Sequence, residues 1–395
     1  MLTIELDIFQ SCALGAIVLW IGKLIKSKVD FLNKYCIPAP VVGGTLFALL
    51  HLALYATGTL EIVFDTTLQT VFMSIFYCSV GYSACFRLIK KGGAPIFLLL
   101  TLTVVMCAIQ DIVGVSLAKV FGLEPLLGLC MGSMPLVGGH GTSGSFGPFL
   151  EENNAVIGAA TVALASATYG LVGGSMMGGP IARARVERKQ LKPTEDVVQI
   201  QENSEIPVIN KTRFTNAAIF LAVAIGVGTF VYAGFKAIGL TFPTYMGAML
   251  CGAIFRNVFD LKKDMDLPLD EIDTIGELSL NLYLAMAMMA LKLWQLAALA
   301  LPMIIILLIQ TVIVALYANF AVFNIMGRDY EAAAFTTAFC GFAMGATPNA
   351  MANMKTLVDR YGPAPKAFFV VPIVGSLFID FFNSLILMGF INVFG

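Results

Sequence analysis

Residues 331–362 read EAAAFTTAFCGFAMGATPNAMANMKTLVDRYG, two apolar arms with a break between them. The break is GATPN at 345–349, and each arm is about 13 residues long, too short to cross about 30 Å of hydrocarbon. A second stretch, 124–150, has the same form, with GGHGT at 138–142 in its middle. Both stretches therefore predict re-entrant loops, whose tips we call the first tip (138–142) and the second tip (345–349).

The composition of the whole chain is that of a membrane protein. Of its 395 residues, 58% are hydrophobic and only 12% are charged, which is about half the charged fraction of a soluble domain. The net charge of −1 provides no field that would attract a polyelectrolyte, so we do not expect nucleic acid as a partner.

A hydropathy window of about 19 residues places ten spans along the chain. They lie near 8–25, 37–57, 67–86, 94–118, 155–181, 214–238, 242–259, 275–294, 296–324 and 367–391. The first run is expected to remain as a span, because no basic residue precedes it as in a signal peptide. We therefore predict an all-α polytopic membrane protein with about ten transmembrane helices.

The basic residues predict the orientation of these spans. All but three of the 24 lysines and arginines lie in the connections after the odd-numbered spans; the exceptions are Lys119, Lys236 and Lys292. Because basic connections stay on the cytoplasmic side, both termini are expected to be periplasmic.

The one long polar segment, 182–213, separates five spans from five spans and predicts a flexible cytoplasmic linker. The two halves, 1–181 and 214–395, resemble each other. A shift of 205 residues sets Gly122 on Gly327, Gly141-Thr142 on Ala346-Thr347 and Gly170 on Gly375, and a shift of 203 sets Pro40 and Gly44 on Pro243 and Gly247. Since five is odd, the second half is inverted. Inverted repeats with broken helices are typical of secondary transporters, whose site lies near the membrane midplane.

The second tip has the features of an anion site. Thr347 is expected to be the N-cap and Pro348 the first helical residue, so that free N–H groups at 347–349 face the midplane and favour a carboxylate. Asn349 and Asn353 share a face of this helix and offer both donors and acceptors. A kinked, glycine-packed helix pair without a ligand is the alternative.

The first tip offers glycine N–H groups and a histidine. Gly138, Gly139 and Gly141 permit the tight reversal that a re-entrant loop needs, and Thr142 is a candidate cap for the outgoing arm, which Pro148 interrupts. His140 has three roles open to it: it binds substrate, carries a proton or bonds a backbone carbonyl. No zinc site is expected, because His51 is the only other histidine.

Asp380 lies near the middle of the tenth span, where a charge is costly enough to suggest a function. Asn383 is three residues further along, and a carboxylate with an amide oxygen suits sodium. Ser166 and Thr168 in the fifth span are further candidates for this sodium site. A structural, hydrogen-bonded aspartate is the alternative for Asp380.

Other polar and small residues inside the spans favour helix packing. Gln110 and Gln310 lie in corresponding spans, with Asp111 beside the first, and bonds between helices explain them at least as well as transport does. A glycine at every fourth position from 170 to 178 allows a close helix approach.

Over nearly its full length the chain resembles the bacterial sodium/glutamate symporters. The stretches that carry the resemblance are IPAPVVGG (37–44), GGHGT (138–142), ATYGLVGG (167–174), LAMAMMALKLWQLA (284–297), ALPMIIILLIQT (300–311), CGFAMGATPNAMANM (340–354) and VVPIVGSLFID (370–380). The resemblance implies sodium-coupled uptake of L-glutamate across the inner membrane by a homodimer, with a mobile core moving against a dimerisation scaffold. It implies no cofactor besides the transported sodium. The family's loop motifs carry over onto Gly138, Gly139, His140, Gly141 and Thr142, and onto Gly345, Ala346, Thr347 and Pro348.

Three other functions compete with this one. A sodium- or proton-coupled transporter of another small di- or tricarboxylate would have the same architecture. An ion channel is less well suited to inverted halves with opposed tips. An intramembrane enzyme would need a paired aspartate, a serine with its base or a metal set, and the sequence holds neither HExxH nor GxSxG.

Overall fold

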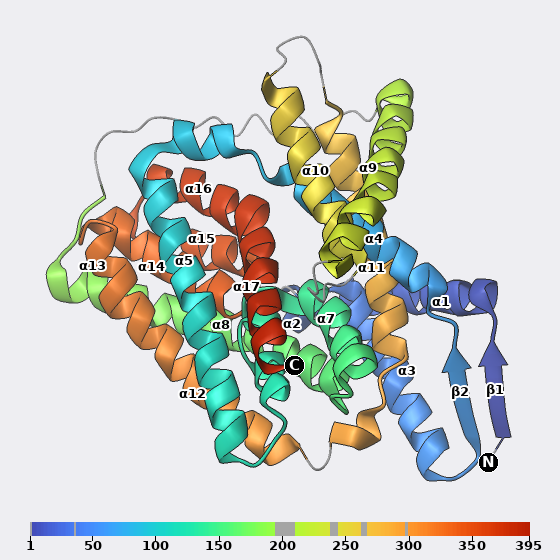
Figure 1. Ribbon diagram of the computed structural model, residues 1–395. Helices are drawn as coiled ribbons and strands as arrows, with labels where there is room; N and C mark the ends of the chain where they lie inside the picture. Colours follow the sequence, from blue (N-terminus) through green and yellow to red (C-terminus); the bar gives the residue numbers. More distant parts are fainter. Residues whose placement is uncertain (1, 35–36, 194–209, 238–243, 262–266, 297–298) are drawn as a thin grey trace. The chain divides into compact units, whose positions relative to one another are not determined.

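The computed structural model describes residues 2–34, 37–193, 210–237, 244–261, 267–296 and 299–395, which are almost entirely helical (Figure 1). Among these residues, five helices are long and apolar enough to cross a membrane. They are α1 (Ile8–Lys26), α3 (Ala39–Ala56), the part of α5 (Phe86–Val120) from Gly93 onward, α9 (Lys211–Ala237) and the helix Ala300–Ile325. A bent pair, Pro365–Gly375 with Ile379–Phe394, is a possible sixth. These apolar helices are what we predicted for an all-α membrane protein.

The other predicted spans coincide with helices that are shorter or less apolar. These are α4 (Thr67–Ser83), α8 (Ala159–Lys189), α10 (Thr244–Leu261) and α11 (Leu269–Met289). α8 extends past the predicted end of its span because basic residues in its last turn interact favourably with the helix dipole. Most of the predicted linker, 194–209, lies outside the described residues.

A small parallel sheet is present that the sequence analysis did not predict. β1 (Leu2–Leu6) pairs with β2 (Leu60–Phe64), with Leu2 opposite Leu60. The Ile62 N–H also donates to His51 Nε2 at 3.1 Å. Both strands are five residues long, and a window of about 19 residues averages such short segments into the neighbouring helices.

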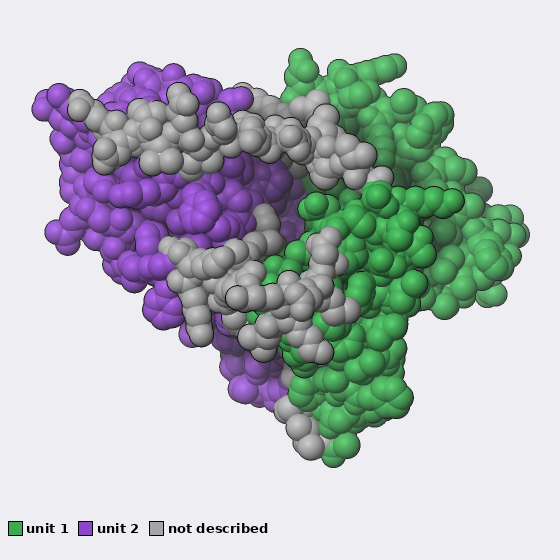
Figure 2. Space-filling view, turned by 90° about the horizontal axis from the view of Figure 1, so that it is seen from above, with its two compact units in different colours: residues 1–84, 144–161, 208–300 green, residues 85–143, 162–207, 301–395 purple. Residues whose placement is uncertain are grey.

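The chain forms two compact units, coloured separately in Figure 2. Unit 1 comprises 1–84, 144–161 and 208–300, and unit 2 comprises 85–143, 162–207 and 301–395. Each unit therefore combines segments from the first and second halves of the chain.

Unit 1 contains two helix pairs that cross at glycines. A Cβ on Gly22 of α1 would lie 2.0 Å from the Ala39 carbonyl oxygen of α3, and one on Gly247 of α10 would lie 2.1 Å from the Gly228 carbonyl oxygen of α9. These backbones approach so closely that no side chain fits between them. α4 and α11 pack on each other and on both pairs. Unit 1 also contains the short helices α2 (Asp30–Lys34) and η2 (Leu293–Leu296) and residues 144–154 of the helix Gly139–Asn154.

Unit 2 contains both tips, all of the second broken stretch and residues 124–143 of the first. The first consists of η1 (Pro125–Met131), α6 (Ser133–Leu136) and α7 (Gly139–Asn154), of which residues 139–143 belong to this unit. The second consists of α14 (Tyr330–Ala343) and α15 (Thr347–Tyr361). The remaining helices of unit 2 are α5, α8, α12 (Ala300–Tyr317), η3 (Ala318–Val322), α13 (Phe323–Ile325), α16 (Pro365–Pro372), η4 (Ile373–Phe378) and α17 (Ile379–Phe394).

Candidate functional site

The two tips meet inside unit 2. Gly139 has a φ of +60°, a left-handed conformation that glycine adopts without strain. A Cβ at this position would lie 3.3 Å from the carbonyl oxygen of Gly345. The structure therefore brings the predicted glycines of the two tips side by side.

The helix starts at the tips differ from those expected. Ala346, with φ −161° and ψ 163°, is the N-cap of α15, and Thr347 is the first helical residue. The prediction that Thr347 caps this helix is wrong, because the extended backbone conformation ends one residue earlier. Thr142 lies inside α7 and its N–H donates to the Gly138 carbonyl oxygen at 3.2 Å. It therefore does not cap the outgoing arm, and α7 continues through Pro148.

Two asparagines attach α15 to its neighbours in unit 2. Asn349 Nδ2 donates to the Leu171 carbonyl oxygen at 2.8 Å, and Asn353 Nδ2 donates to the Gly174 carbonyl oxygen at 3.0 Å. The buried Oδ1 atom of Asn349 has no hydrogen-bond partner among the described residues. An orphaned acceptor in the first turn of this helix is costly unless a ligand group donates to it.

The glycine stripe of α8 packs against the second broken stretch, as predicted. A Cβ on Gly170 would lie 2.2 Å from the Met344 carbonyl oxygen, and one on Gly174 would lie 2.9 Å from the Cys340 carbonyl oxygen. A Cβ on Gly178 would lie 2.4 Å from Asn353 Nδ2. The stripe therefore fixes the position of the second tip relative to α8.

His140 contacts a hydroxyl group in the described structure. Its Nε2 atom lies 2.9 Å from Thr168 Oγ1 of α8, which joins one residue predicted to bind substrate with one predicted to bind sodium. Ser166, two residues before Thr168, is fully buried, and its Oγ atom has no partner within the described part of the chain.

A second cluster of polar groups surrounds Asp111, which lies in α5 and is fully buried. Asp111 Oδ1 accepts the Ser133 N–H at 2.8 Å, and Asp111 Oδ2 lies 2.8 Å from Ser133 Oγ. Ser133 Oγ also lies 2.6 Å from Asn383 Oδ1. We call Asp111, Ser133 and Asn383 the carboxylate cluster.

The carboxylate cluster holds more acceptors than protons. A serine hydroxyl has one proton, so Ser133 cannot donate to both Asp111 Oδ2 and Asn383 Oδ1. One of the two close oxygen–oxygen contacts therefore needs another proton or a cation. Oxygen atoms from a carboxylate, a hydroxyl and an amide are suitable ligands for a hard cation.

The sequence analysis missed two members of this cluster. Asn383 was predicted beside Asp380, which lies one turn earlier in α17, but its amide is hydrogen-bonded to Ser133. The sequence did indicate Asp111, because a carboxylate in the middle of a span is costly and suggests a function, as it does for Asp380. Ser133 carried no signal in the sequence.

Gln110 and Gln310 bond between helices, in agreement with the packing interpretation. Gln110 Nε2 donates to the Ala343 carbonyl oxygen at 2.9 Å, and Gln310 Nε2 donates to the Gln110 carbonyl oxygen at 2.7 Å. These bonds connect α5, α12 and the end of α14 close to the second tip.

Comparison with known proteins gives matches over nearly the whole chain. Residues 4–363 match the family described as sodium/glutamate symporter. The chain is 36% identical over 388 residues to the sodium/glutamate symporter of Escherichia coli (strain K12), covering 97% of each chain. It is 36% identical to the sodium/glutamate symporter of Shigella flexneri over the same length. It is 35% identical over 386 residues to that of Haemophilus influenzae, covering 96% of each chain.

Proposed function

Since the chain belongs to the sodium/glutamate symporter family, we propose that it is a secondary active transporter, which couples sodium entry to L-glutamate uptake across the bacterial inner membrane. The observation that carries this proposal is the match at 36% identity over 97% of a relative that is named a sodium/glutamate symporter. Because the relatives are named as transporters, we assign no enzymatic reaction to the chain.

We further propose that the protein consists of two inverted five-span halves, 1–181 and 214–395, joined by a cytoplasmic linker at 182–213. The order of helices supports this proposal, because equivalent helices start about 205 residues apart. The pairs begin at 8 and 211, 39 and 244, 67 and 269, 93 and 300, and 159 and 365. In this arrangement the stretches 124–150 and 331–362 are re-entrant loops and both termini are periplasmic.

The composition of the two units supports alternating access. Unit 2 contains both tips and the carboxylate cluster, and we assign it as the mobile core. Unit 1 contains the glycine-crossed pairs α1–α3 and α9–α10, and we assign it as the scaffold of a homodimer. Packed units that move as rigid bodies are a common basis of alternating access.

We place the glutamate site at the two tips. The Thr347 N–H at the start of α15 and the Gly139 N–H of the first tip would bind the carboxylate. The Asn349 N–H, which the sequence predicted to be free, instead donates to the Ala346 carbonyl oxygen at 3.0 Å. His140 and the orphaned Asn349 Oδ1 supply side-chain contacts, and the acceptor suits the amino group of the substrate. Gly138, Gly141, Thr142, Gly345, Ala346, Pro348 and Asn353 complete the proposed site.

The Asn349→Ala variant should raise the glutamate concentration for half-maximal uptake by about tenfold, as expected for a lost hydrogen bond to a charged group. Thr356→Ala is the matched control, because Thr356 is exposed on the same helix and bonds only its own backbone at Ala352. The measurement is the initial rate of uptake by each variant across a series of glutamate concentrations, which gives the half-maximal concentration. Equal half-maximal concentrations in the two variants would remove Asn349 from the site.

We place one sodium site at the carboxylate cluster, with Asp380 next to it. A sodium ion between Asp111, Ser133 and Asn383 would balance the buried carboxylate and relieve the oxygen–oxygen contacts. Thr168, which lies beside His140, and the buried Ser166 are assigned to a second sodium site. Glutamate carries a net charge of −1, so two sodium ions would make transport electrogenic, and each uncompensated charge adds about 2.3 kcal/mol per 100 mV.

Uptake of radiolabelled L-glutamate into liposomes that contain the purified protein tests the proposed function. We expect accumulation with an inward sodium gradient and none when choline replaces sodium. Unlabelled aspartate, malate and citrate serve as competitors. No accumulation of glutamate in liposomes with confirmed insertion, together with sodium-driven uptake of radiolabelled malate or citrate by the same liposomes, would show that the cargo is a different carboxylate.

A further inference from the structure

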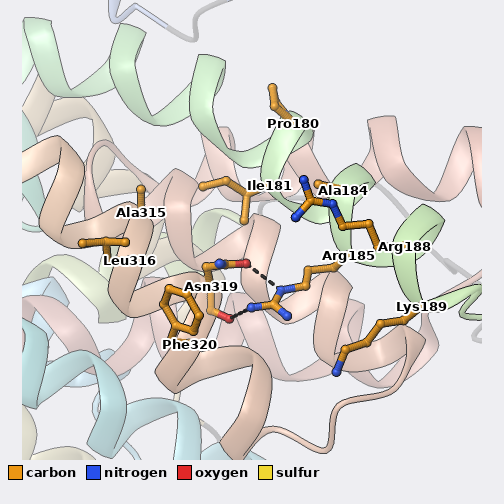
Figure 3. A pocket seen from close by; sticks show the side chains of 10 residues that line it. All are labelled: Pro180, Ile181, Ala184, Arg185, Arg188, Lys189, Ala315, Leu316, Asn319 and Phe320. Atoms are coloured by element: carbon orange, nitrogen blue, oxygen red, sulfur yellow. Dashed lines mark hydrogen bonds between the residues drawn. The ribbon is translucent and has the colours of Figure 1, made fainter.

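A pocket of about 550 Å³ opens between the last turns of α8 and the end of α12 with η3, all within unit 2 (Figure 3). Part of its wall is apolar, with Ile181, Leu316 and Phe320. The rest is cationic, with Arg185, Arg188 and Lys189. None of the ten lining residues is acidic, and none belongs to the tips or the carboxylate cluster.

The basic side chains of the pocket contact neutral groups. Arg185 donates to Asn319 Oδ1 at 2.6 Å and to the Asn319 carbonyl oxygen at 2.7 Å, and its guanidinium lies 4.8 Å from the centre of the Phe323 ring. Lys189 Nζ lies 4.8 Å from the same ring. All these partners are neutral. In the part of the chain that the structure describes, no carboxylate is paired with Arg185, Arg188 or Lys189.

The acidic residue of this helix segment is engaged elsewhere. Glu187 Oε1 accepts hydrogen bonds from Tyr361 at 2.8 Å and from Arg183 at 2.9 Å. These hydrogen bonds hold the pKa of the Glu187 carboxyl below its ordinary value, and the bond from Tyr361 has the largest effect. Glu187 is therefore ionised at neutral pH but bound away from the three cations of the pocket.

The wall of the pocket includes a π-helical turn. Residues Ala318–Val322 form η3, which continues α12 with widened turns. Such turns often mark functional sites. Arg185 donates to the carbonyl oxygen of Asn319 in this turn, and Figure 3 shows both hydrogen bonds within the pocket. The position of Arg185 is thus fixed by the backbone of the neighbouring helix.

An apolar stripe on α12 leads to the pocket. Its residues recur on one helix face and are about half exposed or more: Leu301 70%, Ile304 49%, Leu308 53%, Val312 57%, Leu316 52% and Phe320 57%. From 301 to 320 the helix rises about 28 Å, close to the 30 Å or so of a hydrocarbon core. The pocket therefore lies at one end of a surface with the length and polarity that lipid tails cover.

We propose that the pocket binds the phosphate headgroup of an anionic phospholipid, with an acyl chain lying along the exposed stripe of α12. Charge complementarity selects this occupant, because three cations without carboxylate partners border an apolar surface. Arginine forms paired hydrogen bonds with phosphate, and basic pockets between helices at the cytoplasmic face suit anionic headgroups. The basic end of α8 lies in the connection that the sequence predicts to be cytoplasmic.

Native mass spectrometry of the full-length, delipidated protein tests the proposal. The protein is titrated with phosphatidylglycerol and, separately, with phosphatidylcholine of the same acyl chains. We expect a saturable phosphatidylglycerol adduct that phosphatidylcholine does not reproduce. At about fivefold per basic residue near an anionic group, the Arg188→Gln, Lys189→Gln double variant should bind about 25-fold more weakly. Arg183→Gln, which removes a charge outside the pocket on the same helix, should bind like the unmodified chain.

A second pair of variants tests the site without changing charge. Ala184→Trp places a large side chain in the pocket wall and should abolish the saturable adduct, whereas Ile219→Trp, at an exposed position of α9 outside the pocket and the stripe, should retain it. Equal binding by the double variant and the unmodified chain would overturn the proposal, as would equal loss in Arg183→Gln. Complete displacement of the lipid by millimolar inorganic phosphate would also overturn it, because the occupant would then be a soluble anion.

Discussion

The Asp111→Asn variant is expected to lose sodium-driven accumulation of L-glutamate. Asparagine has nearly the same shape and its Oδ1 atom can still accept the Ser133 N–H, which Asp111 binds at 2.8 Å. The variant removes the negative charge that we propose balances sodium. Breaking a buried charge pair costs about 3 kcal/mol or more, so the sodium concentration for half-maximal uptake should rise by about 100-fold.

Two comparisons separate this effect from misfolding. Asp273→Asn makes the same chemical change at an exposed position in unit 1 and should leave sodium activation unchanged. Sodium-independent exchange of glutamate and the thermal midpoint of the purified protein report on the fold. Normal sodium activation in Asp111→Asn would exclude the carboxylate cluster from the sodium site and leave Asp380, which is partly buried, as the next carboxylate to examine.

The Gly170→Ala variant is expected to be unstable and nearly inactive. The new Cβ would lie 2.2 Å from the Met344 carbonyl oxygen, a backbone atom at the end of α14. That atom cannot move without displacing the second tip, and such overpacking costs about 1–3 kcal/mol. We expect a lower thermal midpoint together with a loss of glutamate uptake.

Gly179→Ala is the control for this prediction. Gly179 lies in the same helix, but the Cβ that alanine adds there enters open space. No atom lies within 4 Å of it. Its effect on helix propensity should be slightly stabilising, since alanine favours helix over glycine. If both variants have the same thermal midpoint and uptake, the contact between α8 and the second tip does not determine the position of the tip.

The sequence predicted local features of the site better than distant contacts. GGHGT and GATPN predicted the two breaks because glycine and proline act on the backbone where they stand. The glycine spacing of α8 predicted its close packing for the same reason. By contrast, Ser133 and Asn383 are 250 residues apart in sequence, and no local pattern indicates that they meet.

The errors also have physical causes. Threonine is a strong N-cap former, so Thr347 was preferred over Ala346, although the extended backbone of Ala346 caps α15 without a side-chain hydrogen bond. The sheet β1–β2 was missed because its strands are too short to change an average over a membrane-length window. The first error is a local preference that the backbone did not follow, and the second is a limit of the window length.

The glycine crossings of unit 1 bear on which positions of the two proposed halves can change. A side chain at Gly22 or Gly43 would enter the backbone of the neighbouring helix, and the same holds at Gly228 and Gly247. Lipid-facing positions accept many apolar residues, so substitutions accumulate there and the two halves diverge in sequence. Positions in direct backbone contact accept no larger residue, so these four glycines are the positions of unit 1 at which we expect the least change.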